Sequence, residues 1–259
     1  MPSIAANILQ VRGRIAAAAT RFNRPAGAAA LLAVSKTCPA DAVREAAATG
    51  QRDFGENYVQ EALDKIAALA DLRAGLCWHL IGPLQSNKTR VVAEQFDWVH
   101  SVDRLKLAER LSAQRPAGLP PLNLCLQVNI SGEASKSGVT PEELPALAQA
   151  VAALPGVRLR GLMAIPEPIE DPDAQRVPHR ALKALFDQLR AQGLALDTLS
   201  MGMSADLEAA VAEGATWVRI GTAIFGARAP RPAGVAQASA ADSMGSNTKG
   251  GVAAGSASA

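Results

Sequence analysis

The chain opens with apolar residues at helical spacing and then changes its rhythm. Ile4, Ile8 and Val11 lie three or four positions apart and Ile15 extends the stripe, so the sequence predicts an amphipathic N-terminal helix. After residues 23–25, short apolar runs alternate with stretches of helical periodicity. This alternation is typical of a parallel sheet whose strands are connected by helices.

The predicted strands are residues 31–36, 53–57, 78–85, 98–103, 123–130, 159–166, 198–204 and 217–225. The predicted helices between them are residues 40–48, 58–70, 104–114, 142–154, 177–192 and 205–213. Eight strands in a chain of 259 residues favour a single α/β domain, a closed (β/α)8 TIM-type barrel with the N-terminal helix as an addition. A doubly wound open sheet is the alternative, which the lack of a G-x-G-x-x-G motif after the first strand weakens.

The composition changes near residue 229, where Ala, Gly and Ser dominate and large apolar side chains become rare. Such a segment cannot bury enough surface to offset its ordering entropy. We therefore predict that residues 1–228 form the barrel domain and that residues 229–259 form a disordered tail.

Charge and composition narrow the class of protein. The net charge of +2 and the 3% of aromatic residues give no basis for nucleic-acid binding. No apolar run approaches the roughly 20 residues of a membrane span, and arginines interrupt the N-terminus where a signal peptide would be apolar. Cys38, Cys77 and Cys125 are far apart and do not cluster with the histidines. We therefore expect reduced thiols, a cytoplasmic protein and no metal site.

Lys36 closes the apolar run at residues 31–36, at the carboxyl end of the first predicted strand. Burying an unpaired ammonium is costly, so an amine here indicates a neutral group or one condensed with an aldehyde as a Schiff base. An aldehyde cofactor would use it in this way, and pyridoxal phosphate (PLP) is the leading candidate. A lysine that ends the strand and extends into solvent is the alternative, which Lys36 by itself favours. The other strand ends reverse that judgement.

Phosphate sites in such barrels are frequently built by the loops after strands seven and eight. Here both loops are rich in Gly, Ser and Thr, which supply close-approaching backbone amides and hydroxyl donors. The candidate phosphate-binding residues are Ser200, Gly202, Gly221 and Thr222. Asp206, in the first turn of the following helix, would repel a phosphate at that helix end. We therefore expect the phosphate nearer to Ser200 and Gly221.

The alternation of the last strand places Arg219 inside the barrel, where a guanidinium needs an acceptor. A cofactor ring nitrogen is one candidate, and an arginine there would leave a pyridine unprotonated and a weak electron sink. A salt bridge to Glu56 or another strand-end carboxylate is the other. His79, alone on its strand, is more often a core residue than a catalyst. Asn57 and Met163 either flank a planar ring or finish their strands.

Several segments together resemble the pyridoxal phosphate homeostasis proteins, a family formerly named proline synthetase co-transcribed bacterial homologue. The matching segments are residues 33–36 (AVSK), 54–58 (FGENY), 78–88 (WHLIGPLQSNK), 129–138 (NISGEASKSG), 161–163 (GLM), 200–206 (SMGMSAD) and 218–226 (VRIGTAIFG). The resemblance runs from about residue 4 to residue 228, and its long motifs follow the same order. It implies a barrel like the N-terminal domain of alanine racemase, with PLP bound.

On single residues, the resemblance implies a Schiff base on Lys36 and a position near the ring nitrogen for Arg219. It implies phosphate contacts for Ser200, Gly221 and Thr222, and it places Asn57, His79 and Met163 around the ring. We therefore expect a PLP carrier or buffer without catalytic residues, which affects amino-acid and keto-acid metabolism. Its expected partners are PLP and PLP-dependent apo-enzymes, and its expected state is a monomer.

An amino-acid racemase or lyase of the alanine racemase type is the alternative. Racemases of the related fold use a second base, a tyrosine from an additional β domain. This chain has a single tyrosine, Tyr58, and no room for that domain, so two-sided proton transfer would lack a partner. A Schiff-base aldolase that acts on a phosphorylated metabolite is a third hypothesis, which the resemblance opposes.

Overall fold

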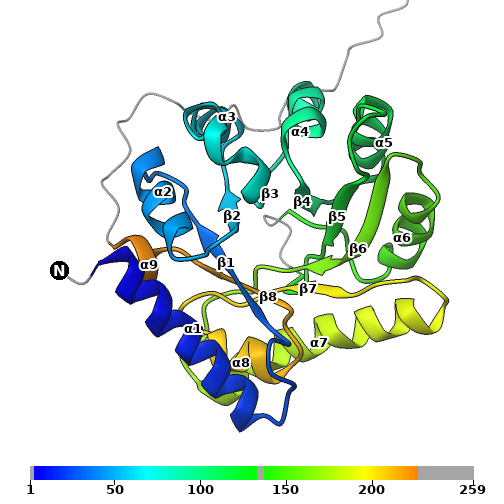
Figure 1. The fold of residues 1–259 in the computed structure, drawn as a ribbon. Coiled ribbons are helices and arrows are strands. Elements are labelled where there is room, and N and C mark those ends of the chain that lie inside the picture. The colour runs from blue at the N-terminus through cyan, green and yellow to red at the C-terminus, as the bar shows by residue number, and fades with distance from the viewer. Residues whose placement is uncertain (1–2, 133–136, 227–259) are drawn as a thin grey trace, which may run out of the picture. The chain divides into compact units, whose positions relative to one another are not determined.

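The computed structural model describes residues 3–132 and 137–226, which form a closed barrel of parallel strands surrounded by helices (Figure 1). The strands are β1 (Ala30–Val34), β2 (Asp53–Glu56), β3 (Cys77–Leu80), β4 (Trp98–Val102), β5 (Leu122–Gln127), β6 (Val157–Met163), β7 (Thr198–Ser200) and β8 (Trp217–Ile220). Each strand pairs with the next in sequence, and β1 closes the barrel on β8, with Leu32 opposite Arg219. The predicted (β/α)8 barrel is confirmed, and the open doubly wound sheet is wrong.

The helices lie outside the barrel and cover the outward faces of the strands. They are α1 (Ile4–Arg21), α2 (Ala40–Ala48), α3 (Val59–Ala68), α4 (Thr89–Gln95), α5 (Leu105–Gln114), α6 (Leu144–Ala152), α7 (Pro172–Ala191), α8 (Leu207–Ala212) and α9 (Thr222–Phe225). Short 3-10 turns at Ala70–Gly75 and Ser86–Lys88 belong to two of the connections. Because all strands run in the same direction, their carboxyl ends and the loops that follow them gather at one end of the barrel.

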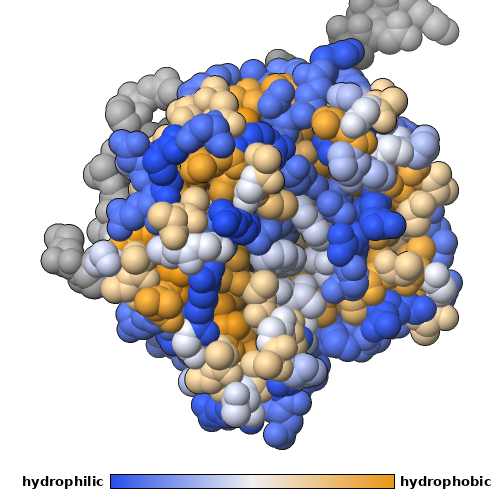
Figure 2. Space-filling view, viewed as in Figure 1, coloured by the Kyte–Doolittle hydropathy of each residue, from blue (hydrophilic) through white to orange (hydrophobic). Residues whose placement is uncertain are grey.

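Alternate residues of each strand divide the core into two parts. Outward-facing residues such as Phe54, Trp78 and Leu124 join the helices in one large apolar cluster. The inward-facing apolar residues form two small clusters, Leu32, Val34 and Ile81 in one and Trp98, Cys125 and Met163 in the other. Buried polar side chains occupy much of the remaining interior. On the face that Figure 2 shows, pale and blue residues lie over the middle of the barrel and apolar patches lie around them.

The N-terminal helix fastens the beginning of the barrel to its last elements. Ile8, Val11 and Ile15 are buried along one face of α1, as their spacing predicts. α1 packs against α8 and α9, where Asn7 Nδ2 donates to the Ile224 carbonyl at 2.8 Å. Figure 1 shows α1 in blue beside the orange α8 and α9. The added helix therefore stabilises the closure between β1 and β8.

Several element boundaries differ from the sequence prediction, chiefly at strand ends that are predicted too long, and the prediction contains no helix at α4. The last strand is predicted to reach residue 225, but β8 ends at Ile220 and the next residues form α9. Gly221 turns the chain there, and Ile224 packs into the outer core. α7 begins at Pro172 rather than at residue 177, because the Asp171 side chain caps its first turn. α4 has only seven residues, too few to show helical periodicity in the sequence.

Besides its first two residues, two segments of the chain lie outside the described residues. One is residues 227–259, which include the predicted tail, so the domain boundary at residue 228 stays a prediction. The other is the segment at residues 133–136, in the loop after β5. Among the described helices, none combines the length and the apolarity that crossing a bilayer requires.

We expect Gly13→Ala to raise the free energy of unfolding by about 0.5–1 kcal/mol. Gly13 is exposed in the middle of α1, and an added Cβ would meet nothing within 4 Å, so alanine would only reduce the conformational entropy lost on folding. Gly50→Ala is the matched control, because its Cβ also has space but its φ of +84° strains an L-residue. Urea denaturation should show opposite signs for the two variants, and equal effects would contradict this account.

Candidate functional site

Lys36 lies just beyond the carboxyl end of β1, in a turn that continues through Thr37 with a φ of +62°. Val34 on β1 pairs with Gly55 on β2. Lys36 and Asn57 each come two residues after this pair, so they leave neighbouring strands at the same height. Lys36 is half-buried, which leaves its amine within reach of a ligand that enters from solvent.

A buried ionic cluster holds the backbone next to Lys36. Lys65 Nζ donates to the carbonyl of Ser35 at 2.7 Å. It also donates to Glu56 Oε1 at 2.8 Å and to Glu61 Oε1 at 2.6 Å. Three acceptors engage every N–H of the Lys65 ammonium, so Lys65 is a poor partner for an aldehyde. The two lysines thus have different roles: Lys65 holds the backbone through the buried ionic cluster, and Lys36 is the candidate Schiff-base amine.

Glu56 is the most constrained member of this cluster. Burial raises the pKa of its carboxyl group, while the nearby Lys65 ammonium and the Ser35 hydroxyl, which donates to Oε1 at 2.6 Å, lower it. Its other oxygen, Oε2, is buried without a hydrogen-bond partner among the described residues. Glu61 extends the cluster to the far side of Lys36 by accepting from the Thr37 amide. The Lys36 turn is therefore fixed at both of its flanks.

A hollow of about 240 Å³ lies beside Asn57 at the same end of the barrel. Its lining residues come from the ends and loops of several strands: Asn57, Ile81, Gly82, Pro83, Gln127, Val128, Asn129, Ser137 and Ile165. A Cβ on Gly82 would lie 2.2 Å from the Asn57 carbonyl oxygen, so this loop can pack here only with glycine. Asn57 Oδ1 is buried without a hydrogen-bond partner in the described part of the chain. A polar ligand in the hollow would satisfy it.

Arg219 points into the barrel and is buried, as the alternation of β8 predicts. Its Nη1 donates to Ser200 Oγ at 2.9 Å and its Nη2 to the Ala164 carbonyl at 2.9 Å. Burial lowers the pKa of the guanidinium to about 10, which still leaves it charged at neutral pH. The alternative salt bridge to Glu56 is wrong, because Glu56 pairs with Lys65. A cofactor ring nitrogen as a further acceptor stays a prediction.

The candidate phosphate-binding residues lie at the ends of the neighbouring strands β7 and β8. Ser200 ends β7 and is fully buried, with its hydroxyl engaged by two side chains of the interior. Gly202 follows in the β7 loop with a φ of +89°. Gly221 is buried at the start of α9, and Thr222 beside it is exposed. The structure brings these residues to one end of the barrel, and their contact with a phosphate stays a prediction.

The barrel interior holds polar contacts that the sequence pattern did not connect. His79 Nδ1 lies 2.9 Å from His100 Nε2, and His79 Nε2 lies 3.1 Å from Asp53 Oδ1. His100 Nδ1 in turn lies 2.8 Å from Ser200 Oγ. Met163 is buried in the same interior, opposite Ser200 in the β6–β7 register. His79 is thus joined to the candidate site through His100, which the sequence analysis did not single out.

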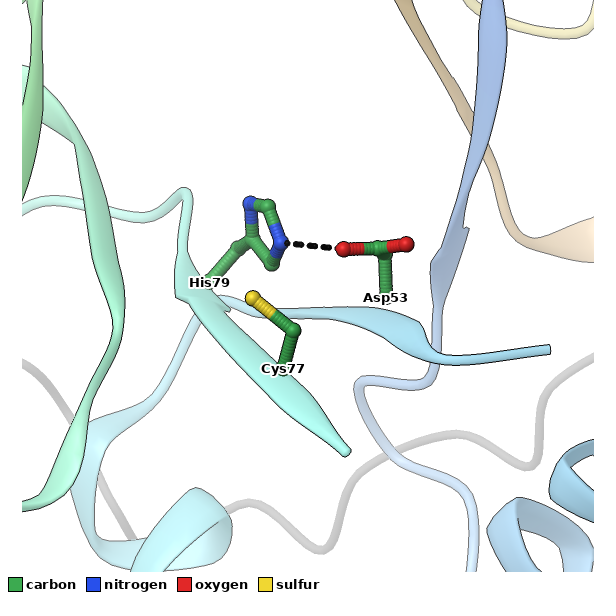
Figure 3. A group of neighbouring side chains, drawn as sticks. All are labelled: Asp53, Cys77 and His79. Carbon is green, nitrogen blue, oxygen red and sulfur yellow. Dashed lines mark hydrogen bonds and ion pairs between the residues drawn. The ribbon is translucent and has the colours of Figure 1, made fainter. Parts of the chain in front are cut away.

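Asp53, Cys77 and His79 come together toward the amino ends of β2 and β3, with one polar or sulfur atom of each within 4.8 Å of the others (Figure 3). The prediction that the cysteines and histidines lie apart is therefore wrong for Cys77 and His79. Residues two apart on a strand share a face, and the β2–β3 register sets Asp53 opposite Cys77. Burial, reinforced by nearby carboxylates, raises the pKa of the Cys77 thiol, which stays protonated at neutral pH.

Known proteins match this chain over nearly the whole barrel. Residues 7–229 match the family model of the alanine racemase N-terminal domain. The pyridoxal phosphate homeostasis protein of Pseudomonas aeruginosa is 67% identical over 228 residues, which cover 88% of this chain and 97% of that protein. The protein of the same name from Escherichia coli is 58% identical over 229 residues, which cover 88% of this chain and 98% of that protein. The chain belongs to the pyridoxal phosphate homeostasis protein family.

Solved structures agree with this family assignment. PipY of Synechococcus elongatus, solved with PLP bound, has a TM-score of 0.72 and 44% identity, and the match covers 82% of this chain and 100% of that one. Alanine racemase of Corynebacterium glutamicum has a TM-score of 0.63 and 18% identity, over 90% of this chain and 62% of that one. The racemase likeness shows a shared barrel fold, in agreement with the resemblance drawn from the motifs.

Two residues near the site that the sequence analysis missed have a recognisable sequence pattern. Glu61 and Lys65 are four positions apart on α3, a spacing that favours an ion pair on one helix face. Their burial depends on how α3 packs over β1 and β2, which the spacing does not give. His100 carried no such signal, because its partners His79 and Ser200 come from two other strands.

Proposed function

We propose that this chain binds PLP at the carboxyl end of its barrel, through a Schiff base to Lys36, and serves in intracellular PLP homeostasis. The observation that carries the proposal is the held Lys36 turn at the end of β1, in a chain 44% identical to a protein solved with PLP bound. Lys36 Nζ would supply the amine that condenses with the cofactor aldehyde, with the loss of one water molecule. The cofactor would supply an electrophilic aldehyde carbon, a group that no amino-acid side chain provides.

The phosphate group would be held by the ends of β7 and β8. Gly221 and Thr222 lie next to the end of β1, because Ala33 pairs with Ile220 in the barrel closure. Their backbone amides and the Thr222 hydroxyl are suitable donors for a phosphate. Ser200 would contribute from the end of β7. Lys36 and the phosphate site would then anchor the cofactor at two separate points.

Arg219 would set the electronic character of the bound ring. A guanidinium that stays protonated donates to the ring nitrogen and leaves it unprotonated, which weakens the ring as an electron sink. Asn57 and Met163 would border the ring, and His79 would support it from the interior. Such a site stabilises carbanions poorly, and this supports a carrier or buffer of PLP rather than a catalyst.

The cysteines and the barrel closure support a compartment and an oligomeric state for this protein, and the cofactor chemistry supports its partners. We place it in the cytoplasm, because Cys77 and Cys125 are thiols enclosed in the barrel rather than members of disulfides. A closed barrel has no unpaired strand edge, which supports a monomer. PLP-dependent apo-enzymes would receive the cofactor, because their own Schiff-base lysines compete for the same aldehyde.

The absorbance spectrum of the purified protein, before and after borohydride, tests the proposal. We expect a yellow band that borohydride bleaches and a reduced pyridoxyl group on the peptide that contains Lys36. A colourless protein that also fails to take up added PLP would contradict PLP binding. An adduct on another lysine would contradict only the role of Lys36.

Solvent deuterium separates a carrier from an enzyme. Incubating the PLP-loaded protein with amino acids in deuterated water should leave their α-positions unlabelled, because the site has a weak electron sink. Rapid α-deuteration would instead support the racemase or lyase hypothesis. Borohydride-treated protein is the control, because it retains the fold and has lost the reactive C=N bond.

A further inference from the structure

Five polar side chains form one continuous hydrogen-bonded chain through the barrel interior. Its contacts are Arg219 Nη1 to Ser200 Oγ at 2.9 Å, Ser200 Oγ to His100 Nδ1 at 2.8 Å, His100 Nε2 to His79 Nδ1 at 2.9 Å, and His79 Nε2 to Asp53 Oδ1 at 3.1 Å. This series of hydrogen bonds starts at the carboxyl end of β7 and ends at Asp53, the first residue of β2. It therefore spans the barrel from the candidate site toward the opposite opening.

The two ends of this chain decide the direction of every hydrogen bond in it. A guanidinium only donates, so Ser200 Oγ accepts from Arg219 and must place its own proton on another acceptor. His100 Nδ1 is the acceptor within reach, so the proton of His100 is on Nε2. At the other end a carboxylate only accepts, so His79 donates from Nε2 to Asp53 and accepts at Nδ1. Both histidines are then neutral, with their protons on Nε2.

The surroundings support this assignment independently. Burial, together with nearby His79 and Arg219, holds the pKa of His100 well below its usual range, so the ring is neutral. The His79 ring stacks on Trp98 with centroids 5.4 Å apart and an interplanar angle of 6°, and the edge of Trp217 contacts it. Both histidines are fully buried, so their rings have no water to replace a lost partner.

We propose that Asp53, His79 and His100 are positioning residues, which act as a one-way hydrogen-bond relay that orients Ser200 and Arg219 at the cofactor end. The part of this inference that concerns the cofactor rests on the proposed function. Among the described residues no carboxylate forms an ion pair with Arg219, although the Asp206 charge raises its pKa, and the relay connects Arg219 to a second carboxylate through hydrogen bonds. Four hydrogen bonds connect Arg219 to Asp53. Because all of them point the same way, the Asp53 charge influences Ser200 through the two histidines.

A divalent metal is the competing occupant of the Asp53 end. The side chains of Asp53, Cys77 and His79 offer a set of donors that zinc accepts, with their atoms within 4.8 Å (Figure 3). Protons already satisfy these groups, because the Cys77 thiol and His79 Nε2 can both donate to Asp53. A metal on His79 Nε2 would move the ring proton to Nδ1 and reverse every bond of the relay. The two occupants therefore predict opposite histidine tautomers.

Nitrogen-15 NMR of the wild-type protein tests the polarity without any substitution. The chain has three histidines, and His179, whose Nε2 lies 2.9 Å from Asp206 Oδ2 outside the relay, serves as an internal reference. We expect His79 and His100 to be neutral with their protons on Nε2, unchanged by a chelator. A charged His100, or a proton on Nδ1 of either ring, would overturn the relay. A proton on Nδ1 that a chelator moves to Nε2 would assign a metal site instead.

Two substitutions of one residue test the link to the cofactor end. The polar atoms of asparagine are as far from Cβ as histidine Nδ1, whereas those of glutamine are as far as Nε2. His100→Asn can therefore keep the acceptor for Ser200, and His100→Gln can keep only the contact to His79. We expect the Kd for PLP to be about tenfold weaker in His100→Gln than in His100→Asn, the order expected for one hydrogen bond in a charged network.

The outcomes separate this inference from the proposed function. If the wild-type protein does not bind PLP, the proposed function fails, and the NMR result still decides the polarity of the relay. If the wild type binds PLP but both folded variants bind it equally, the positioning role fails. Circular dichroism identifies a variant that does not fold, and Ser200→Ala then replaces the pair. In that variant the Asp53 end still holds the His100 proton on Nε2, so the relay predicts the same tautomer with a shifted Nδ1 signal, and a proton that moves to Nδ1 would overturn it.

Discussion

Lys65→Met is expected to lower the free energy of unfolding by about 3–5 kcal/mol, the usual cost of removing one partner of a buried ion pair. Lys65 is buried, with its ammonium on Glu56, Glu61 and the Ser35 carbonyl. Methionine keeps most of the side-chain volume but supplies no donor. Glu56 would then be left in the core with a single hydroxyl partner.

The loss should depend on pH in a direction that the Glu56 pKa fixes. Burial raises this pKa, and removing the Lys65 ammonium, which lowers it, raises it further. A carboxyl group whose pKa is raised on folding contributes stability that is fully present below its unfolded pKa of about 4.3. That stability is lost as the pH rises through the folded pKa. The difference between the variant and the wild type should therefore be larger at pH 8 than at pH 5.

Urea denaturation at the two pH values measures this effect. Lys183→Met is the matched control, because Lys183 pairs with Asp187 on the surface of α7, where such a pair contributes less than about 0.5 kcal/mol. Adding Glu56→Gln to the Lys65 variant should recover part of the stability and remove its pH dependence. A Lys65 variant as stable as the Lys183 variant would show that the cluster is not needed for the fold.

Lys36→Ala is expected to abolish the yellow band and the borohydride-reducible adduct, because the amine that forms the Schiff base is gone. The fold should survive with a change in stability of about 1 kcal/mol or less, because Lys36 lies in a half-buried turn that its neighbours hold. Lys65 should not replace it, since three acceptors already saturate its ammonium.

Absorbance spectroscopy and peptide mass mapping check this result. Lys183→Ala is the control, because Lys183 lies in the middle of α7, where it pairs with Asp187 on the surface. It should keep the band and the adduct unchanged. An adduct that persists in the Lys36 variant would place the Schiff base on another amine.

The barrel could be predicted from sequence because its strands carry their own signal. A strand buried on both faces reads as a short apolar run, and glycine or proline then marks its end. The inward direction of Arg219 followed from alternation alone, and the structure confirms it. Lys36 could be placed at a strand end for the same reason.

The interior network could not be predicted, because it depends on distances that local patterns do not contain. His100 and Ser200 are 100 positions apart, and they meet only when the barrel closes. The register also shifts between Val99 and Val102 on β4, which alternation alone does not show. Likewise, Lys65 has the pattern of a helical surface residue, and its burial results from how α3 packs over the Lys36 turn.

The pairing of β1 with β8 has a consequence for synthesis on the ribosome. The first strand emerges early, but its second neighbour is among the last described elements to be translated. Until then the part of α1 that packs on α8 and α9 has no partner, and the nascent chain leaves this apolar surface exposed. The strand ends next to Lys36 and Gly221 also come together only at that moment. On the proposed function, the nascent chain would lack a complete cofactor site until the barrel closes, and cofactor uptake would report that folding has finished.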